Sequence, residues 1–332
     1  MIRILVVHHS QTGQLTRIAR SFLSPLAGRP DVQIDWHQVD AVPPYPFPWP
    51  LLDFFDAFPE SIHGDPPTVA QPTIPESTDY DLVVLAWQVW FLSPSLPITG
   101  FLASPARHIL KNRRVISIIA CRNMWTTAWR TMSARLHDAG AIVVDNVVLT
   151  DTGPLWSTFI TTPWWLLSGK QESPVAWLPR AGVSEADING AARFGHALVD
   201  ALPAIRSGSH GPFLGGLAAV AVDRHTMLAE RIGARSFQIW GALVRRVGKP
   251  GDAARKPILI VYIVFLALMI LTVLPVSMLV TAILARFSSR VTQQAKDLEA
   301  PSGSGRDRLS HFRVADPPLG SGQHELGRPP VC

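Results

Sequence analysis

Cysteine is scarce in this sequence of 332 residues, which contains two, Cys121 and Cys332. Two cysteines do not form the set of disulfides that stabilises small secreted domains. Their spacing is not that of a zinc site, which needs clustered thiols or histidines. The sequence therefore excludes a disulfide framework and a zinc module, and the few cysteines fit a reducing compartment.

Other patterns are missing as well. No Gly-x-Gly-x-x-Gly fingerprint occurs, so we infer no separate nicotinamide domain. The formal net charge is +5 and the pI is near 9.6. The basic residues of the first two thirds are not gathered into a patch interleaved with aromatic residues, and we expect no nucleic-acid partner. The apolar run at the N-terminus is too short for a cleavable signal sequence.

The start of the chain joins an apolar segment, 2–7, to a hydroxyl-rich loop that contains a glycine. The segment is typical of a buried parallel strand, and the apolar residues from Leu15 to Leu23 have helical spacing. A phosphate in such a loop would meet free backbone N–H groups at the positive end of the helix dipole. The alternative is an ordinary turn with a helix cap. The loop residues are Ser10, Gln11, Thr12, Gly13, Gln14 and Leu15.

Two further apolar segments, 81–86 and 115–120, each precede a loop rich in large side chains. The first loop contains Trp87, Gln88, Val89, Trp90 and Phe91, and Trp90 is the residue that we expect to stack on a planar ligand. The second contains Cys121, Arg122 and Asn123, of which Arg122 and Asn123 could bond the edge of such a ligand. The alternative for the aromatic residues is a place in the core. Cys121 lacks an activating partner, so we expect a small core-edge residue rather than a nucleophile.

The alternation of strands and helices predicts one doubly wound α/β domain of five parallel strands. The remaining strands are expected at 32–39 and 141–149, with a closing helix from 184 to 202. In such a sheet, ligands bind beyond the carboxyl ends of the strands, and the three loops described above all leave such ends.

The first loop resembles the flavodoxin signature, in which Thr-x-Thr-Gly-x-Thr or Ser-x-Thr-Gly-x-Thr binds the phosphate of FMN. Here Leu15 stands in place of the last threonine, so the backbone N–H groups would carry more of the binding. The resemblance implies the strand order 2-1-3-4-5 and FMN as the cofactor. It also implies that the loops after the third and fourth strands flank the flavin ring.

An uncharged stretch, 257–285, is long enough to cross a bilayer, which needs about 20 apolar residues. Pro275 divides it, so a single kinked span and a re-entrant hairpin both remain open. More basic residues precede the stretch than follow it, which places the α/β domain on the cytoplasmic side. These residues are Arg245, Arg246, Lys249, Arg255 and Lys256 before it, against Arg286, Arg290 and Lys296 after it. We therefore expect localisation at the inner, cytoplasmic membrane.

These patterns divide the chain into four parts: an FMN-binding domain at 1–203, a linker at 204–256, a transmembrane segment at 257–287 and a tail at 288–332. The linker has basic and apolar residues at amphipathic spacing, so it would lie on anionic headgroups or pack on the α/β domain. The tail is polar and rich in Gly and Pro, which favours disorder.

Two aromatic insertions, 43–59 and 154–167, are rich in Trp and Phe, and the first is also rich in proline. Loops of this kind commonly serve function. They would form a lid over a hydrophobic substrate, or else cover the sheet edge or dip into the bilayer.

Taken together, the three loops and the apolar segment resemble a bacterial family associated with dialkylresorcinol biosynthesis, whose members are named condensing enzymes. Condensation by a ketosynthase needs an activated Cys, which Cys121 is not. Flavin chemistry fits an aromatising oxidation of a hydrophobic ring better, with His9 or His8 as a weak candidate for the proton acceptor and Arg122 as a second weak catalytic candidate.

Two alternative functions remain open, an NAD(P)H:quinone-type reductase at the membrane and a non-catalytic membrane adaptor or electron carrier. The expected partners are a hydrophobic small molecule and membrane lipid, with biosynthetic partner enzymes or a homodimer as further candidates.

Overall fold

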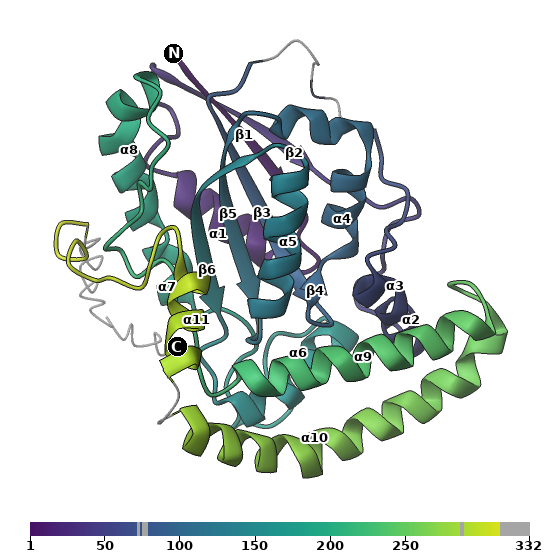
Figure 1. Cartoon of the computed structure of the whole chain (residues 1–332). Helices are drawn as coiled ribbons and strands as arrows, with labels where there is room; N and C mark the ends of the chain where they lie inside the picture. The colour runs from purple at the N-terminus through teal and green to yellow at the C-terminus, as the bar shows by residue number, and fades with distance from the viewer. Residues whose placement is uncertain (72–73, 75–78, 286–288, 313–332) are drawn as a thin grey trace, which may run out of the picture.

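The computed structural model describes residues 1–71, 74, 79–285 and 289–312. A parallel sheet of five long strands lies at its centre (Figure 1). The spatial order is β2-β1-β3-β5-β6, and a two-residue strand, β4, pairs antiparallel with the end of β3. This is the predicted order 2-1-3-4-5, so the doubly wound, flavodoxin-like arrangement is confirmed. The strands are β1 (Ile2–His8), β2 (Val32–Gln38), β3 (Leu82–Trp90), β4 (Ser93–Pro94), β5 (Arg114–Cys121) and β6 (Ile142–Thr150).

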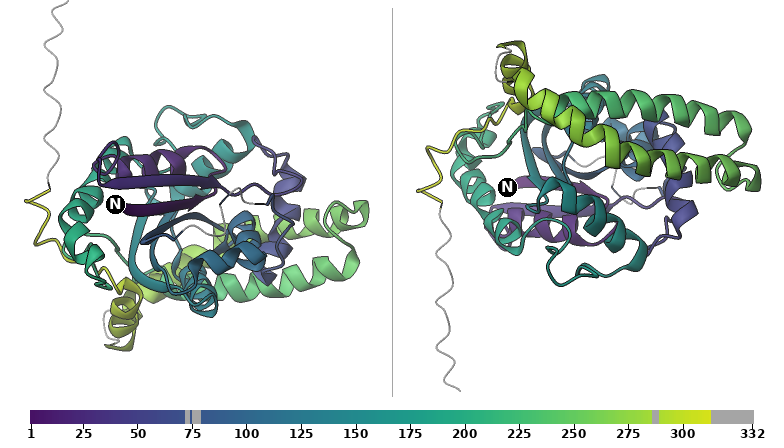
Figure 2. Two further views of the ribbon diagram at one scale, coloured as in Figure 1. Left: turned by 90° about the horizontal axis from the view of Figure 1, so that it is seen from above. Right: turned by 90° about the horizontal axis from the view of Figure 1, so that it is seen from below.

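Helices cover both faces of the sheet because the crossovers are right-handed and run in opposite directions from β1 (Figures 1 and 2). One face carries α1 (Gln14–Leu23) and α8 (Ala192–Arg206), which pack together through the stacked rings of Phe22 and Phe194. The other carries α4 (Leu96–Ala103), the 3-10 helix η1 (Pro105–Leu110) and α5 (Thr126–Asp138). The apolar face of α1 is fully buried, as its spacing predicts.

The two aromatic insertions form short helices at the carboxyl edge of the sheet. The first contains α2 (Leu51–Asp56) and α3 (Phe58–His63), and the second contains α6 (Leu155–Ser168). The expected closing helix is divided into α7 (Glu185–Gly190) and α8 by a short break at Ala191. The insertions therefore stand where a ligand of this fold would bind.

The segment after α8 leads to two long helices that run side by side beneath the α/β domain (Figures 1 and 2). They are α9 (Met227–Val247) and α10 (Lys256–Ala285), joined through a short 3-10 turn, η2 (Ala253–Arg255). Helix α10 coincides with the predicted apolar stretch and is continuous through Pro275. Within the described residues, one helix segment, Ala253–Val280, is long and apolar enough to cross a membrane, with a mean hydropathy of 2.9.

Helix α9, which lies in the predicted linker, has two apolar faces. One face fits packing on the α/β domain, and the other fits contact with a membrane surface. Met227, Ala234 and Val244 are buried against the rest of the chain. Ile239 and Leu243 are exposed, by 63% and 38%. Packing on the α/β domain is thus observed, while the other face stays free.

The expectation of a disordered tail is wrong for residues 289–312. Helix α11 (Ser289–Glu299) buries Ala295 and Leu298 in the main core. Beyond it, Ser302 Oγ donates to Asp145 Oδ1 at 2.7 Å and accepts from the backbone N–H of Asn146 at 2.8 Å. The buried carboxylate of Asp145 in β6 therefore holds the tail against that strand. The polar composition of the tail does not predict this attachment. The part of the tail at 313–332 lies outside the described residues.

Candidate functional site

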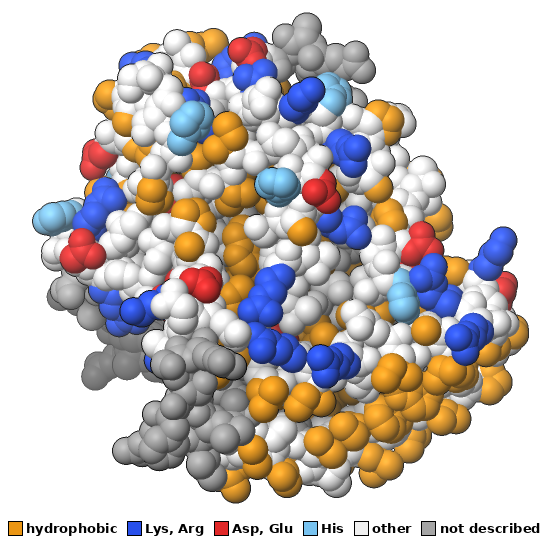
Figure 3. All heavy atoms as spheres, viewed as in Figure 1, with side chains coloured by type: hydrophobic (Ala, Val, Ile, Leu, Met, Phe, Trp, Pro, Cys, Tyr) orange, Lys and Arg blue, Asp and Glu red, His pale blue; other side chains and the backbone are white. Residues whose placement is uncertain are grey.

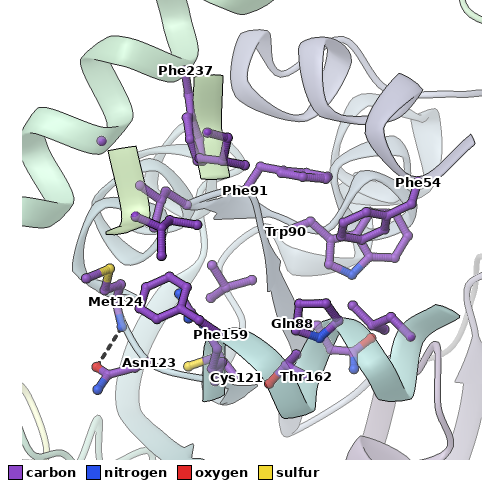
Figure 4. Close-up of a pocket in the computed structure, with 18 of the residues that line it drawn as sticks. Phe54, Gln88, Trp90, Phe91, Cys121, Asn123, Met124, Phe159, Thr162 and Phe237 are labelled. Atoms are coloured by element: carbon purple, nitrogen blue, oxygen red, sulfur yellow. Dashed lines mark hydrogen bonds between the residues drawn. The ribbon is translucent and has the colours of Figure 1, made fainter. Parts of the chain in front are cut away.

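A cavity of about 410 Å³ opens at the carboxyl ends of β1, β3 and β5, and residues from all three predicted loops line it (Figure 4). Phe91 and Phe237 border it on one side, and Cys121, Thr162 and Phe159 border it on the opposite side. The lining residues that the sequence predicted are Gln11, Thr12, Gln14, Leu15, Gln88, Val89, Trp90, Phe91, Cys121, Arg122 and Asn123. The predicted residues Ser10, Gly13, Trp87 and His9 do not line it.

The loop between β1 and α1 retains unused hydrogen-bond donors. No side chain caps α1, whose N-cap residue Gly13 adopts a left-handed conformation with φ 78°. The hydroxyl of Ser10 is buried and has no partner among the described residues. Gly13 is exposed, and a Cβ added there would meet no atom within 4 Å, so the backbone at this position is open to solvent. A helix N-terminus with free N–H groups and an orphaned hydroxyl fits a phosphate.

Glutamine side chains hold this loop against its neighbours. The backbone N–H of Gln11 donates to Gln88 Oε1 at 2.9 Å, which joins the first loop to the second. The side chain of Gln14 exchanges two hydrogen bonds with the backbone of Val183, at 2.9 and 3.1 Å. A polar side chain at the start of α1 therefore serves as a brace, and the loop is fixed before any ligand binds.

The second loop is a tight turn that places aromatic rings at the cavity. Strand β3 continues to Trp90, which pairs with Ser93 of β4. The two residues between them, Phe91 and Leu92, have φ values of 49° and 61°, a left-handed conformation that is strained for side chains of this size. Such strain is characteristic of binding sites, where the surrounding structure enforces it.

Trp90 stands with its edge toward Tyr45, Trp49 and His9, with ring centroids 5.2 to 5.8 Å apart. Trp87 lies elsewhere: it is fully buried and donates through Nε1 to Ser117 Oγ at 2.9 Å. The core alternative therefore describes Trp87, whereas Trp90 is part of the cavity wall.

The third loop supplies the positive charge of the site. Arg122 lies over the ring of Phe159, with Cζ 3.8 Å from the ring centroid. Burial lowers the pKa of Arg122 to about 10, so the guanidinium remains protonated at neutral pH. Asn123 Oδ1 accepts from the N–H of Met124 at 2.7 Å. Burial raises the pKa of the Cys121 thiol, which agrees with the expectation that it is not a nucleophile.

His9 stands behind Trp90 in a defined tautomer. Its Nδ1 is 2.9 Å from the carbonyl oxygen of Val39, so Nδ1 carries the proton and donates it. Nε2 is buried without a partner among the described residues, and burial lowers the pKa of the ring. His9 is therefore neutral and does not face the cavity directly.

The pH dependence of stability tests whether His8, which is buried near the site, is neutral in the folded protein. Burial, with a smaller contribution from His9, lowers the pKa of His8 to about 4. The unfolded chain binds this proton near pH 6.5, so the contribution of His8 to stability is complete above that pH. It is lost as the pH falls toward 4, by roughly 3 kcal/mol. We expect the free energy of unfolding of His8→Leu, measured in detergent, to fall less with acidification than that of the parent chain.

His137 gives the matched control because its side chain is 91% exposed. His137→Gln should leave the acid dependence of the unfolding free energy as it is in the parent chain. Equal slopes for His8→Leu and the parent chain would show that His8 is not buried as a neutral group.

The roof of the cavity comes from the second aromatic insertion, which the sequence predicted as a lid, and from the long helices α9 and α10, which the sequence did not assign to the site. Helix α6 contributes Phe159, Thr162 and Trp165, and the hydroxyl of Thr162 is buried without a partner in the described chain. The long helices contribute a further apolar set, Ile232, Phe237, Phe265, Leu266, Met269, Ile270 and Val273. The predicted membrane stretch thus forms one wall of the binding site.

Glu230 connects this roof to the third loop. Its carboxylate accepts from Thr126 Oγ1 at 2.9 Å and from the backbone N–H of Thr127, at the N-terminus of α5. Burial raises the pKa of Glu230, although these hydrogen bonds oppose the shift. Glu230 therefore caps α5, although it is 104 positions from Thr126 in the sequence. The same contact fixes α9 beside Arg122.

The chemistry available in the cavity follows from its lining. Of the described residues that line it, Arg122 is the one with a charged side chain, and none is a histidine or a carboxylate. The protein therefore offers positive charge and amide groups at one end and aromatic and aliphatic surface at the other. This combination suits binding and orientation, and no strong base from the described chain reaches the cavity.

No family model and no curated protein matches this chain. Among solved structures, it is similar to a flavoprotein from Lactobacillus acidophilus NCFM in complex with FMN, at 19% identity over 45% of this chain and 93% of that chain, with a TM-score of 0.36. It is also similar to a WrbA-like flavodoxin from Agrobacterium tumefaciens, at 11% identity over 63% and 100% of the two chains, with a TM-score of 0.33. A flavodoxin from the domain Archaea is 10% identical over 62% and 99%, with a TM-score of 0.31.

Proposed function

We propose that this chain is an FMN-dependent oxidoreductase that works at a membrane on a hydrophobic ring substrate. One observation carries the proposal: a cavity with an aromatic and aliphatic wall reaches the loop before α1 through Thr12 and Gln14, and the unpartnered hydroxyl of Ser10 and the uncapped start of α1 belong to the same loop. A flavin mononucleotide has the same two-ended chemistry, with a charged phosphate and a planar ring.

The residues divide the work by position. The α1 N-terminus, with Ser10 and Thr12, would hold the phosphate. Trp90 and Phe91 would flank the ring from one side, and Arg122 and Asn123 would face its polar edge. Bound FMN would supply two-electron redox chemistry, and the positive charge of Arg122 would favour the reduced, anionic ring. His9 holds its ring as a neutral acceptor behind Trp90 and takes no direct part at the cavity.

The character of the substrate follows from the wall made by α9 and α10. The inner side of α10 lines the cavity with Phe265, Met269 and Val273, and its outer side exposes Leu268 and Leu271 by 57% and 73%. One helix thus separates the cavity from the exposed apolar surface, so a lipid-soluble molecule has a short route to the site. The family resemblance suggests a dialkylcyclohexenone-type ring that becomes an aromatic resorcinol, and the domain would face the cytoplasm.

The first experiment is a visible absorption spectrum of the full chain purified in detergent, followed by release and mass analysis of any yellow chromophore. We expect FMN near one per chain. Hydrogen bonds to charged groups are worth about 1.5–3 kcal/mol each. The double variant Ser10→Ala, Thr12→Ala should therefore weaken FMN binding roughly a hundredfold or more.

Ser24→Ala is the matched control, because Ser24 is an exposed hydroxyl at the other end of the same helix. It should retain FMN like the parent chain. A colourless protein that cannot be loaded with FMN would overturn the proposal and favour a non-catalytic adaptor.

Substrate screening of the FMN-loaded protein then separates the two enzyme alternatives. Rapid NAD(P)H oxidation coupled to a lipid-soluble quinone would identify a quinone-type reductase. Bleaching of the flavin by an alkylated cyclohexenone, without a nicotinamide, would identify the aromatising oxidation.

A further inference from the structure

The ends of α10 are both tied to the same α/β domain. At its N-terminal end, the guanidinium of Arg255 is buried between Glu60 and Asp56, with Nη2 2.6 Å from Glu60 Oε1. Tyr262, in the second turn of α10, stacks on Phe58 with ring centroids 4.3 Å apart and an interplanar angle of 10°. Asp56 and Phe58 belong to the first aromatic insertion, and Glu60 follows it within α3.

The C-terminal end is attached at a different place on the same domain. Helix α11 begins at Ser289, shortly after α10 ends, and buries Leu298 in the core that includes the sheet. Gln294 Oε1 accepts from Arg231 of α9 at 2.6 Å. The following segment is bonded to Asp145 of β6 through Ser302, and the N–H of Ala218 donates to the carbonyl of Gly305 at 2.6 Å.

This attachment is incompatible with a helix that crosses a bilayer once. A helix of 30 residues is about 45 Å long, and the hydrocarbon core is about 30 Å thick. A crossing would place α11 on the far side of the membrane from the strand that it packs against. One set of buried contacts, around Glu60 or around Asp145, would then have to be lost.

The exposed surface of α10 suits a bilayer from the side instead. Most of its outward residues are aliphatic and recur at helical spacing: Ile260, Val261, Val264, Leu268, Leu271, Val276 and Leu279. The exposed Thr272 donates its hydroxyl to the carbonyl of Leu268 within the helix. Together with exposed residues of α9 they form an apolar band along one side of the molecule, bordered by basic side chains (Figure 3). Exposed Arg235, Arg245, Arg246, Lys249 and Lys256 lie on α9 and at the turn between the two helices. This charge is complementary to anionic headgroups.

The geometry points to a monotopic membrane protein, in which α10 lies in the plane of one leaflet of an anionic phospholipid bilayer, with both of its ends on the side of the α/β domain. This inference rests on the membrane association in the proposed function, and it replaces the transmembrane segment that the sequence predicts by an in-plane helix. Lipid covers the apolar band, and α10 separates that leaflet from the cavity.

Cysteine labelling of the full chain in oriented membrane vesicles tests the inference. Cys332→Ser serves as the background, and a membrane-impermeant maleimide is applied to either face. Lys249→Cys and Lys296→Cys report the two ends of α10, because both side chains are exposed. His137→Cys, on the outside of the α/β domain, marks the side of that domain.

We expect Lys249→Cys and Lys296→Cys to react from the same face as His137→Cys, and neither from the opposite face. Reaction of the two ends from opposite faces would overturn the in-plane arrangement and establish a span. A bimane label at Leu268→Cys should be quenched most by lipids brominated near the headgroups, about 5–10 Å below the interface. Strongest quenching at the bilayer centre would contradict the inference.

The FMN content of the same vesicles separates this inference from the proposed function. Protein that carries FMN but spans the bilayer would refute the in-plane helix alone. Protein that stays in the soluble fraction as a dimer, with the apolar bands facing one another, would refute lipid as the occupant. In-plane labelling without FMN would support the inference and count against the redox function.

Discussion

Replacing Arg255 by methionine is expected to lower the free energy of unfolding by about 3–5 kcal/mol, because it removes the buried guanidinium that pairs with both Glu60 and Asp56. The side chain of Arg255 is 1% exposed, and those of Glu60 and Asp56 are 10% and 17% exposed. Its Nε also donates to the carbonyl of Gly248 at 2.9 Å, so the guanidinium fixes the turn between α9 and α10. Denaturant or thermal unfolding of the variant in detergent gives the measurement.

Arg245→Met is the matched control for Arg255→Met. Arg245 bonds Asp65 at 2.9 Å, and the two side chains are 36% and 59% exposed. Its Nε lies 3.9 Å from Glu60 Oε1, beyond hydrogen-bond distance, so we expect Arg245→Met to cost about 1 kcal/mol. Equal losses in the two variants would show that Arg255 is solvated like Arg245. The functional consequence of Arg255→Met is a looser first insertion, whose Phe54 and Phe55 line the cavity.

The sheet could be predicted because each strand is a local property of the sequence. Segments 2–7 and 115–120 each contain five apolar residues out of six, a pattern typical of a strand covered on both faces. The three loops follow from the same fact, since parallel strands end at one edge. The place of Trp87 could not be predicted in this way, because β3 continues past the expected end at Ala86 to Trp90. Trp87 is therefore still within the strand and packs in the core.

The part of the roof that α9 and α10 form was not predictable, for a different reason. Composition distinguishes apolar from polar residues, but it does not distinguish a side chain that meets lipid from one that lines a cavity. Helix α10 has both kinds, with Met269 at the cavity and Leu268 exposed. The contacts that place it, such as Arg255 with Glu60, join residues 195 positions apart. Local patterns carry no information about such pairs.

The structured part of the tail, at 289–312, likewise depends on contacts with distant residues that local sequence patterns do not predict. Ala295 and Leu298 are two apolar residues in a stretch that otherwise favours disorder, and both are buried. Ser302 completes the attachment through Asp145, which is itself buried and also accepts from the N–H groups of Phe213 and Leu214. The signal was the charged residue Asp145 within an apolar strand, since a buried carboxylate requires donors from another segment.

Gly195→Ala is expected to lower the free energy of unfolding by about 3 kcal/mol, because α8 crosses α1 too closely for any side chain. A Cβ at Gly195 would lie 2.0 Å from the carbonyl oxygen of Phe22 and 2.7 Å from Cδ of Pro25. Neither atom can move without its backbone, so the two helices must separate. Because α1 carries the proposed phosphate loop at its N-terminus, the same change should reduce FMN retention. Chemical unfolding and flavin content of one preparation measure both effects.

Gly190→Ala is the comparison that isolates the close approach of the two helices. A Cβ at Gly190 would meet only Nη1 of Arg193, at 3.2 Å, and this side-chain end has to shift by only a few tenths of an ångström. Alanine favours the helix by up to about 1 kcal/mol over glycine. This variant should therefore be as stable as the parent chain or more so, and it should keep its flavin. If Gly195→Ala behaved like Gly190→Ala, α1 and α8 would not be in contact at Phe22. The support that holds the phosphate loop at the sheet edge would then have to come from Gln14 and Gln88 alone.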